Sequence, residues 1–593
     1  MKTPSGQNAQ HMDPVFLLSM WADHQKQQGQ EVICAGMGRP TYALNETMVQ
    51  SFVSYWAQVQ ASTRPVIGYG YPQGDLVARE HMATAMSSWY QTEVLPQNVL
   101  FTVGGAGALR VIFDTFDEVY QNKAGYRIIT PLPYYTLYAD HAHHRLHPIE
   151  VMKSPGYQLT AEVLKQSIEA AYQEAKTDGA YPQVVLLCNP NNPLGTVIAR
   201  EELQKIATVL KAYPALYIML DEAYTEMSFV MEEAPSLLTL APELKSRMVI
   251  LRSATKALAA AGERLAMLMA FDEQLMMQFM AKNIHLIGHA PRSAQRAYAD
   301  TMLTLTPQNL EPLVLYYFNK SRYVQQRLQE MGAKMPDPLY QPQGTFYVMA
   351  DLSDFLGHPL SPQVQDIIGP HERIETDEDL VYTLLIHHGL MFAPLSYFGA
   401  NKREGYVRIT CSGSEEELCQ MMDRLQHGLY AIRDQNHRQR LQKTDEIMQK
   451  KAGESLGTLE TSGDSVNVSP PSQAPMCLKV QENIRAEEAH LKTMTTKVSM
   501  VRSHSWAFFT QAMGNPESPK RRSPAISPGR IAKDQESWRT FVEKLVKPSE
   551  IQHLLLNLDP KDRAHFTLWR SPTPQARHAQ LQSTSPSLLC TTI

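Results

Sequence analysis

The stretch MVILRSATKALAAAGERLAMLMA, Met248–Ala270, contains two apolar runs with a polar, glycine-containing segment between them. The runs are MVIL at Met248–Leu251 and LAMLMA at Leu265–Ala270, and they have the length and composition of buried β-strands. Lys256 follows the first run closely, and Arg264 lies two helical turns beyond it. The stretch therefore predicts a strand that ends in a loop carrying a lysine, and then a second strand.

The same rhythm extends from about Pro65 to Ala270, where short apolar runs alternate with longer segments of helical spacing. It predicts an α/β fold with a large, doubly wound, mostly parallel sheet covered by helices on both faces. Several runs end at Gly, Pro, Asp or Asn, so their carboxyl ends open into loops where such sheets usually bind ligands. The other runs are VLFTV at Val99–Val103, RIIT at Arg127–Thr130, VVLLC at Val184–Cys188 and LYIML at Leu216–Leu220.

The pattern changes from about Asp300 to Arg433, where a long helical stretch, QGTFYVMADL, another helix and YVRITCSG predict a smaller α+β domain. Upstream, VFLLSMWADH places apolar residues at helical spacing and predicts an arm that packs on the body or on a second subunit. The expected division is an arm over 1–45, a large domain with the doubly wound sheet over 46–300, a small domain over 301–433 and an extension over 434–593.

The C-terminal extension is expected to be partly disordered. Glu454–Pro475 and Pro516–Arg530 are rich in Ser, Gly, Thr or Pro, which is typical of linkers and disordered segments. Lys520–Arg522 is interpreted as a solvated patch, and Trp538–Val546 as one face of a short helix. No chemistry is assigned to the extension, and an unknown protein partner for it is left open.

Composition narrows the class of protein. Hydrophobic residues make up 43% of the 593 residues and charged residues 19%, a balance typical of globular proteins. The net charge of −5 gives no reason to expect a nucleic acid or a membrane surface as partner. The amino terminus lacks the apolar run of a secretory signal, and six cysteines without a CxxC pair indicate reduced thiols in a cytoplasm.

Three segments supply groups for a cofactor with a phosphate, a basic ring nitrogen and an aldehyde. GGAGALR at Gly104–Arg110 follows a predicted strand and opens a helix, where backbone N–H groups and the helix dipole favour phosphate. By itself, it is equally well explained as a tight strand-to-helix turn. LDEAY at Leu220–Tyr224 ends its strand with the carboxylate of Asp221, and Lys256 offers an amine.

In this order, the segments resemble the aminotransferase class I and II family of pyridoxal-phosphate enzymes, fold type I, from about Gly36 to Gly413. The resemblance implies pyridoxal 5'-phosphate as cofactor and a homodimer acting on an amino acid and a 2-oxo acid. Further matching segments are YGYPQG at Tyr69–Gly74, LPYY at Leu132–Tyr135, NPNNPLG at Asn189–Gly195 and YVRITCSGS at Tyr406–Ser414.

The resemblance implies a role for each matching residue near the cofactor ring. Lys256 is expected to be the Schiff-base lysine, and Asp221 to pair with the pyridine nitrogen. Tyr224 and Asn192 are expected to reach the ring hydroxyl, with the bond from Asn192 to Pro193 in the cis form. An aromatic residue, Tyr135 by the match, is expected over the ring.

The other implied roles concern the phosphate and the substrate. The phosphate is expected to bind to backbone N–H groups of Gly105 and Ala106, to Ser253 and Arg264, and to Tyr69 of the neighbouring subunit. The substrate is expected to place its α-carboxylate on Arg408, because a planar guanidinium suits a carboxylate bidentately. The same substrate pocket is expected to be closed by Gly38 and to include Asn192.

The sequence departs from the family pattern at a position that bears on the substrate. Members that prefer dicarboxylic substrates carry an arginine in the region where this chain has Ile284 and His285. A preference for aspartate is therefore not expected unless Arg292 or Arg39 supplies the missing charge. Ala106 also replaces a common hydroxyl residue, so phosphate binding is expected to depend more on backbone groups.

The expected function is transamination in amino acid metabolism, in a biosynthetic role, with Lys256, Asp221 and Tyr224 as catalytic residues. A lyase or decarboxylase using the same cofactor is an alternative, since a fold does not fix the chemistry. A regulatory protein whose tail binds a partner is another. DHAHHRLH at Asp140–His147 holds four histidines, but a surface helix is the preferred interpretation and no metal is expected.

Overall fold

The computed structural model describes residues 1–9, 12–121, 124–142, 145–230 and 234–457, with side chains described up to residue 438 except at 307. Most of the predicted extension lies outside these residues. This holds for the part of the linker Glu454–Pro475 that follows residue 457, for Pro516–Arg530 with its basic patch, and for the predicted helix Trp538–Val546. Within the described chain, no helix has the length and apolar character needed to span a bilayer.

A seven-stranded sheet forms the larger core, with strand order β2-β8-β7-β6-β5-β3-β4. All neighbouring strands are parallel except β8, which runs antiparallel to both β7 and β2. The mostly parallel sheet predicted from the apolar runs is therefore confirmed. The strands are β2 Val99–Val103, β3 Arg127–Leu132, β4 Leu146–Glu150, β5 Pro182–Cys188, β6 Tyr217–Asp221, β7 Met248–Ser253 and β8 Leu265–Ala270.

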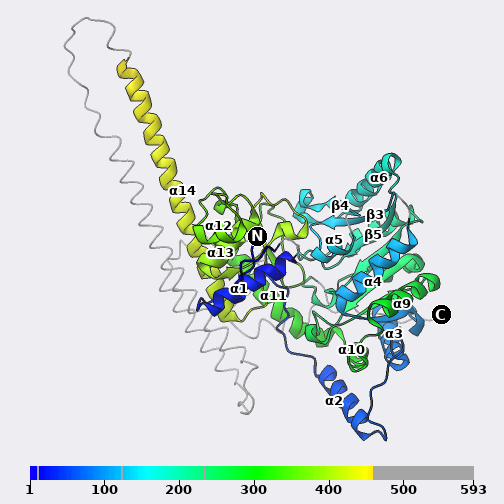
Figure 1. The fold of residues 1–593 in the computed structure, drawn as a ribbon. Coiled ribbons are helices and arrows are strands. Elements are labelled where there is room, and N and C mark those ends of the chain that lie inside the picture. The colour runs from blue at the N-terminus through cyan, green and yellow to red at the C-terminus, as the bar shows by residue number, and fades with distance from the viewer. Residues whose placement is uncertain (10–11, 122–123, 143–144, 231–233, 458–593) are drawn as a thin grey trace, which may run out of the picture. The chain divides into compact units, whose positions relative to one another are not determined.

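Helices cover both faces of this sheet, because successive strand side chains point to opposite sides. In β5, Val185 and Leu187 join a buried cluster with α3, α6, α7 and α10, whereas Val184 and Leu186 join a cluster with α4 and α9. The fold is thus doubly wound, as predicted (Figure 1). These helices are α3 Leu76–Tyr90, α4 Gly104–Val119, α6 Ala161–Asp178, α7 Arg200–Lys211, α9 Glu273–Ile287 and α10 Arg292–Thr304.

The parallel register brings three loop-forming strand ends to one edge of the sheet. Cys188 at the end of β5 pairs with Asp221 at the end of β6, and Asp221 pairs with Leu251 near the end of β7. The segment after β7 is not a regular α-helix, because it forms turns and the short 3₁₀ helix Ala261–Glu263 before β8. Lys256 therefore lies in a loop beside the carboxylate of Asp221.

The histidine-rich segment is only partly helical, which corrects the predicted surface helix. Helix α5 ends at Ala142, and Leu146 and His147 belong to edge strand β4, which pairs with β3. The histidines hid the strand signal, and Pro148 is tolerated because the strand is at an edge. Two of the four histidines, at positions 143 and 144, lie outside the described residues, which contain no group of three potential metal ligands. Helix α5 spans Thr136–Ala142.

A second buried cluster surrounds a three-stranded antiparallel sheet of order β11-β12-β9. Leu18 and Ala22 of α1 are buried in this cluster, so the N-terminal helix packs on the body as expected. Helix α14 continues through Arg433 without a break, and the predicted division into domains stays a prediction. The elements are α1 Pro14–Gln27, β1 Ile33–Cys34, α11 Pro307–Glu330, β9 Tyr347–Asp351, α12 Pro362–Ile368, α13 Asp377–His388, β10 Leu390–Met391, β11 Ala393–Pro394, β12 Tyr406–Thr410 and α14 Glu415–Gly457.

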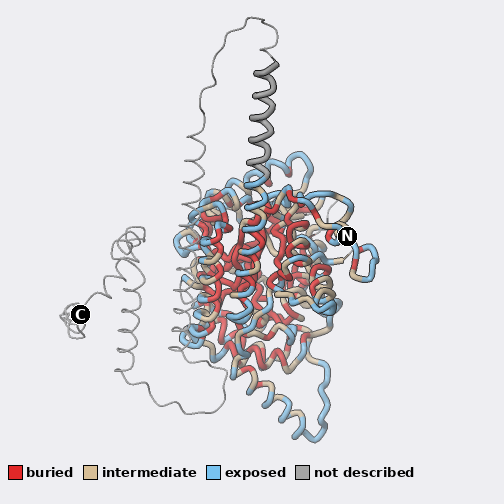
Figure 2. Tube along the Cα trace, turned by 90° about the vertical axis from the view of Figure 1, so that its left-hand side faces the viewer, coloured by how far each residue is buried: buried red, intermediate tan, exposed pale blue. Residues whose placement is uncertain are grey.

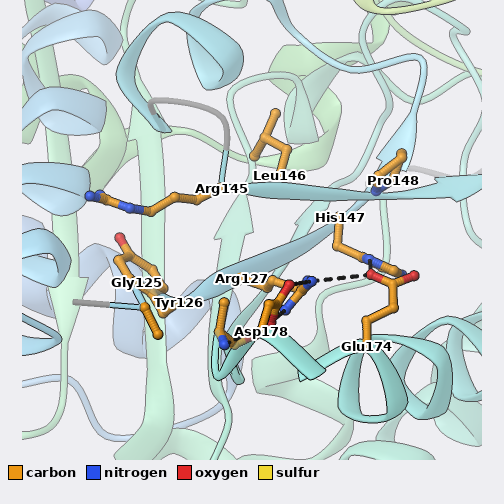
Figure 3. Close-up of a pocket in the computed structure, with 11 residues that line it drawn as sticks. Gly125, Tyr126, Arg127, Arg145, Leu146, His147, Pro148, Glu174 and Asp178 are labelled. Atoms are coloured by element: carbon orange, nitrogen blue, oxygen red, sulfur yellow. Dashed lines mark hydrogen bonds and ion pairs between the residues drawn. The ribbon is translucent and has the colours of Figure 1, made fainter. Parts of the chain in front are cut away.

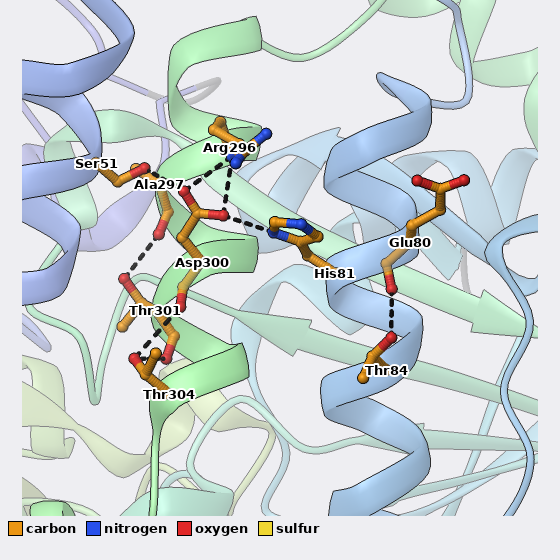
Figure 4. Close-up of polar contacts among 9 residues, drawn as sticks. All are labelled: Ser51, Glu80, His81, Thr84, Arg296, Ala297, Asp300, Thr301 and Thr304. Atoms are coloured by element: carbon orange, nitrogen blue, oxygen red, sulfur yellow. Dashed lines mark hydrogen bonds and ion pairs between the residues drawn. The ribbon is translucent and has the colours of Figure 1, made fainter.

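Helix α2, Glu46–Ala61, stands out from the rest of the described chain, and its outer end is largely exposed (Figures 1 and 2). Its inner part is held by Asp300 of α10, whose carboxylate accepts hydrogen bonds from Ser51 of α2 at 2.7 Å and His81 of α3 at 2.7 Å (Figure 4). Arg296 donates to the same carboxylate at 2.9 Å. Asp300 therefore fixes α2 and α3 against α10.

Candidate active site

A cavity of about 490 Å³ opens at the carboxyl ends of β5, β6 and β7. Eleven of the twelve site residues predicted from the sequence line it, although they come from segments far apart in the chain. Tyr69 is the exception. The lining residues among the predicted set are Gly38, Gly105, Ala106, Tyr135, Asn192, Asp221, Tyr224, Ser253, Lys256, Arg264 and Arg408.

The amine of Lys256 is held against the backbone of the N-terminal segment. Its Nζ donates to the carbonyl oxygen of Gly38 at 2.7 Å and lies 5.8 Å from the centre of the Tyr224 ring. A Cβ atom on residue 38 would lie 2.0 Å from the hydroxyl of Tyr347 and 3.2 Å from Lys256 Nζ. Glycine is therefore required for this close approach.

Asp221 is a buried carboxylate on the floor of the cavity, with 5% of its surface exposed. Burial raises the pKa of this carboxyl, whereas the Tyr138 hydroxyl, the backbone N–H of Ala223 and the charge of Lys256 oppose the rise. Tyr138 donates to Oδ2 and Ala223 N to Oδ1 at 3.2 Å. Such a carboxylate is suited to a cationic N–H partner, which would offset the cost of its burial.

The turn between β2 and α4 forms an anion cradle with Arg264. Gly104 has a φ of +67°, and a Cβ there would lie 2.6 Å from Arg264 Nη2, so glycine lets the guanidinium approach the helix start. Ser253 is close in the same cavity, and its Oγ donates to Thr255 Oγ1 at 2.6 Å. Hydroxyl groups, a guanidinium and a helix N-terminus are together suited to a phosphate.

Arg408 also lines this cavity and is 4% exposed. Its guanidinium donates to Asn192 Oδ1 at 2.8 Å and to the Gly36 carbonyl at 2.6 Å, and it stacks over the Tyr347 ring at 4.1 Å. Its Nε has no hydrogen-bond partner among the described residues. The bond from Asn192 to Pro193 is cis, as expected. This guanidinium is fixed in orientation and can bind a carboxylate.

Tyr224 and Tyr135 line the cavity close to the carboxylate of Asp221. The Tyr224 hydroxyl lies 2.7 Å from that of Tyr347, and burial raises the pKa of Tyr224 well above its usual range. Tyr135 packs edge-on against Tyr138, with 5.7 Å between ring centres. The tyrosines therefore supply neutral hydroxyl groups and an aromatic wall.

Sequence reasoning missed several residues that line the cavity or hold its groups. Tyr138 lies one helical turn after Tyr135, and that spacing could have indicated it. Tyr347 holds both Tyr224 and Arg408, but nothing in the local sequence distinguishes it from a core tyrosine. Other cavity-lining residues outside the predicted set include Asp13, Val15, Met37, Leu109, Leu137, Cys188, Thr255 and Phe398.

Tyr69 lies outside this cavity, with 98% of its side chain exposed. Its ring contacts that of His289 edge-on, with 6.0 Å between centres, and His289 accepts from the backbone N–H of Gly70 at 3.0 Å. Tyr69 therefore cannot contribute to the cavity of its own chain in this arrangement.

Another cavity, of about 640 Å³, lies at the amino-terminal ends of β3 and β4 (Figure 3). Its charged groups are paired with each other: Arg127 donates to Asp178 at 3.0 Å, and His147 Nδ1 lies 3.5 Å from a carboxylate oxygen of Glu174. Burial lowers the pKa of His147. Because these charges satisfy one another, the smaller cavity around Lys256 is the better candidate active site.

Comparisons with known proteins agree with this geometry. The chain matches the family model "Aminotransferase class I and II" over residues 33–425. An aspartate aminotransferase of Streptomyces avermitilis is 24% identical over 420 residues, which cover 69% of this chain and 92% of that protein. Human kynurenine–oxoglutarate transaminase 1 is 26% identical over 421 residues, which cover 66% of this chain and 91% of that protein.

Solved structures share the fold. The aspartate aminotransferase of Rhizobium meliloti aligns with a TM-score of 0.59 at 21% identity, covering 71% of this chain and 97% of that one. A single mutant of the Thermus thermophilus aspartate aminotransferase aligns with a TM-score of 0.58 at 20% identity, with the same two coverages. Since the family model spans more than half of the chain, this protein belongs to the class I and II aminotransferases, which use pyridoxal 5'-phosphate.

Proposed function

We propose that this aminotransferase binds pyridoxal phosphate in the cavity around Lys256 and there moves an amino group from an amino acid to a 2-oxo acid. Three groups that this reaction needs lie together in one cavity, although they come from distant parts of the chain. An amine, a buried carboxylate and an oriented guanidinium, from Lys256, Asp221 and Arg408, line one cavity of about 490 Å³.

The donor set fits the cofactor. The cradle of Gly105, Ser253 and Arg264 suits the phosphate, and burial raises the pKa of the Asp221 carboxyl, which a neighbouring cation would lower. A protonated ring nitrogen would be such a cation. Tyr135 would cover the ring, while Asn192 and Tyr224 would reach its hydroxyl. Ala106 offers only its backbone N–H to the phosphate.

When bound, pyridoxal phosphate supplies an aldehyde that an amine can attack and a ring that withdraws electrons from the substrate. Lys256 carries that amine, and it removes and returns the proton at the substrate Cα. Arg408 holds the α-carboxylate, so that the Cα–H bond faces Lys256. Asp221 keeps the ring nitrogen protonated, because a carboxylate in a buried site stabilises a neighbouring cation.

A homodimer is part of this proposal. Tyr69 is almost fully exposed and would reach the phosphate of a second copy, and further apolar side chains are exposed on α2 and the segment that follows it. Such a surface is typical of a protein interface. These side chains are Val53, Trp56, Val66, Ile67 and Tyr71. Light scattering should give twice the chain mass, and V53E/W56E should yield monomers with little activity.

The cellular setting is proposed on chemical grounds. Cys34, Cys188, Cys411 and Cys419 are free thiols in the described residues, which is consistent with a reducing cytoplasm. A biosynthetic role in amino acid metabolism fits a reaction that exchanges amino groups. Fractionation of the native cells would test the location.

The function is tested with the full chain loaded with cofactor. An amino acid alone should release about one equivalent of 2-oxo acid per site, and more only after 2-oxoglutarate or pyruvate is added. K256A should abolish both the release by the amino acid alone and the further release after the acceptor is added. K245A should retain both, because the Lys245 amine lies over Phe271 outside the cavity. Continued product formation without an acceptor would instead show a lyase.

A further inference from the structure

The active-site cavity contains a cation that the proposed function does not use. Its four basic side chains are Arg39, Lys256, Arg264 and Arg408. Lys256 carries the amine, Arg264 lies at the phosphate cradle and Arg408 is held at the α-carboxylate position. Arg39 has no role among these.

The segment that carries Arg39 is held in place on both sides. Gly36 and Gly38 accept hydrogen bonds from Arg408 and Lys256 through their carbonyl oxygens, at 2.6 and 2.7 Å. Farther along, the backbone N–H of Thr41 donates to the Tyr317 hydroxyl at 2.9 Å. The position of Arg39 relative to the reacting amine is therefore set by the backbone.

A tight turn and a proline restrict the residue further. The backbone N–H of Arg39 donates to the carbonyl of Met37 at 2.9 Å, which closes a three-residue turn around Gly38. Pro40 follows and restricts Arg39 to extended backbone conformations. Adjacent Cα atoms are about 3.8 Å apart, so the Arg39 side chain starts next to the residue that contacts Lys256.

The guanidinium of Arg39 has no partner in the part of the chain whose side chains are described, and the residue is exposed. The two carboxylates that line the cavity are engaged elsewhere. Asp13 caps α1 by accepting from Phe16 N at 2.7 Å, and Asp221 accepts from Tyr138. Neither carboxylate is paired with Arg39, so its guanidinium is available to an anion that enters the cavity.

Arg292, the other arginine that could supply this charge, is committed outside the cavity. Its Nε donates to Asp75 Oδ2 at 2.8 Å and its Nη1 to the Gly68 carbonyl at 3.3 Å. It lines a separate cavity of about 360 Å³ together with Tyr71 and Asp300. For the cavity of its own chain, the described arrangement thus favours Arg39 over Arg292.

We propose that Arg39 binds the side-chain carboxylate of the substrate, so that the enzyme prefers four- and five-carbon dicarboxylic amino acids and 2-oxo acids. The inference rests on the proposed function of the same cavity. Arg408 takes the α-carboxylate and Arg39 the distal one, which places the Cα–H bond between two fixed ends near Lys256. A substrate without the second carboxylate lacks this orientation.

The first test is a ratio of kcat/KM values for the full-length holoenzyme. R39Q should lower the ratio of aspartate to alanine, and of 2-oxoglutarate to pyruvate, about 10- to 100-fold, the loss expected for a charged hydrogen bond. R39K should fall between R39Q and the wild type, because it keeps the charge without the planar fork. R292Q is the matched control and should keep both ratios within about twofold of the wild type.

The second test does not depend on turnover. Calorimetric titration of the holoenzyme should show that succinate binds more tightly than butyrate, and R39Q should bring the two affinities within about threefold of each other. Unchanged succinate binding in R39Q, or a selective loss in R292Q, would overturn the assignment. If no amino acid transfers its amino group, the proposed function fails, whereas the succinate titration still decides the role of Arg39.

Discussion

The hydroxyl of Tyr138 donates a hydrogen bond to Oδ2 of Asp221, the carboxylate on the floor of the active-site cavity. Both groups are buried. Burial raises the pKa of the Asp221 carboxyl, and this hydrogen bond opposes the rise because it favours the ionised form. Tyr138 is thus a positioning residue that helps Asp221 remain able to pair with a cation.

Y138F should therefore weaken pyridoxal-phosphate binding by about 1 to 2 kcal/mol, or about five- to thirtyfold. The dissociation constant is measured by titrating the apoenzyme and following visible absorbance. Y126F is the matched control, because Tyr126 donates to Asp117 at 2.9 Å away from the cavity. Equal cofactor affinity in Y138F and Y126F would contradict the role of Tyr138.

G38A should nearly abolish transamination while leaving the melting temperature within a few degrees of the wild type. The added Cβ would lie 2.0 Å from the Tyr347 hydroxyl, which must move, and 3.2 Å from Lys256 Nζ. A displacement of about 1 Å at a reacting group can cost about 10²-fold in rate. Steady-state kinetics and thermal melts measure the two effects. G262A, at an open position with nothing within 4 Å of the new Cβ, should behave as the wild type.

The local sequence predicted the sheet well, because its strands are apolar runs that end in recognisable loops. Each of the six predicted runs forms a strand, and the parallel register then gathers Asn192, Asp221 and Lys256 at one edge. Strand β4 was missed because it lies at the edge of the sheet and is short and polar. The roles of Tyr138 and Tyr347 depend on contacts across the chain, such as Tyr347 with Tyr224 at 2.7 Å, which no local pattern encodes.

Stability should fall as pH rises from about 5 to 7 because of Asp377. Burial raises the pKa of this carboxyl to about 7, although Ser396 donates to it from both its backbone and its side chain. The folded state therefore binds more protons than the unfolded state, whose aspartate pKa is about 3.9. The stabilisation from protonated Asp377 is fully present below about pH 4 and is lost as pH rises through 7. Above that pH, Asp377 causes no further change in the free energy of unfolding.

D377N should flatten the dependence of the unfolding free energy on pH between 5 and 8, measured by urea denaturation at each pH. D178N is the control, because Arg127 lowers the pKa of Asp178 to about 2. That carboxyl is ionised in both states across the window, so its removal should leave the slope unchanged. Parallel slopes for D377N and the wild type would contradict the raised pKa of Asp377.

R252M should destabilise the fold by about 3 to 5 kcal/mol, since it removes one partner of a fully buried ion pair. Arg252 is 0% exposed, donates to Glu226, bonds the Tyr90 hydroxyl at 3.2 Å and lies 4.4 Å from the Trp89 ring centre. Without it, Glu226 keeps a buried charge. The double variant R252M/E226Q should recover part of the stability lost in R252M, because E226Q removes that charge.

The comparison variant for Arg252 is R127M, whose ion pair with Asp178 is formed with an exposed carboxylate. Exposed pairs contribute about 0 to 1 kcal/mol, so R127M should lower the denaturation midpoint far less than R252M. Guanidinium denaturation of the holoenzyme gives both midpoints, and the slope of each transition must match the wild type for the comparison to hold. Equal losses in the two variants would show that the Arg252 cluster stabilises the fold no more than a surface pair does.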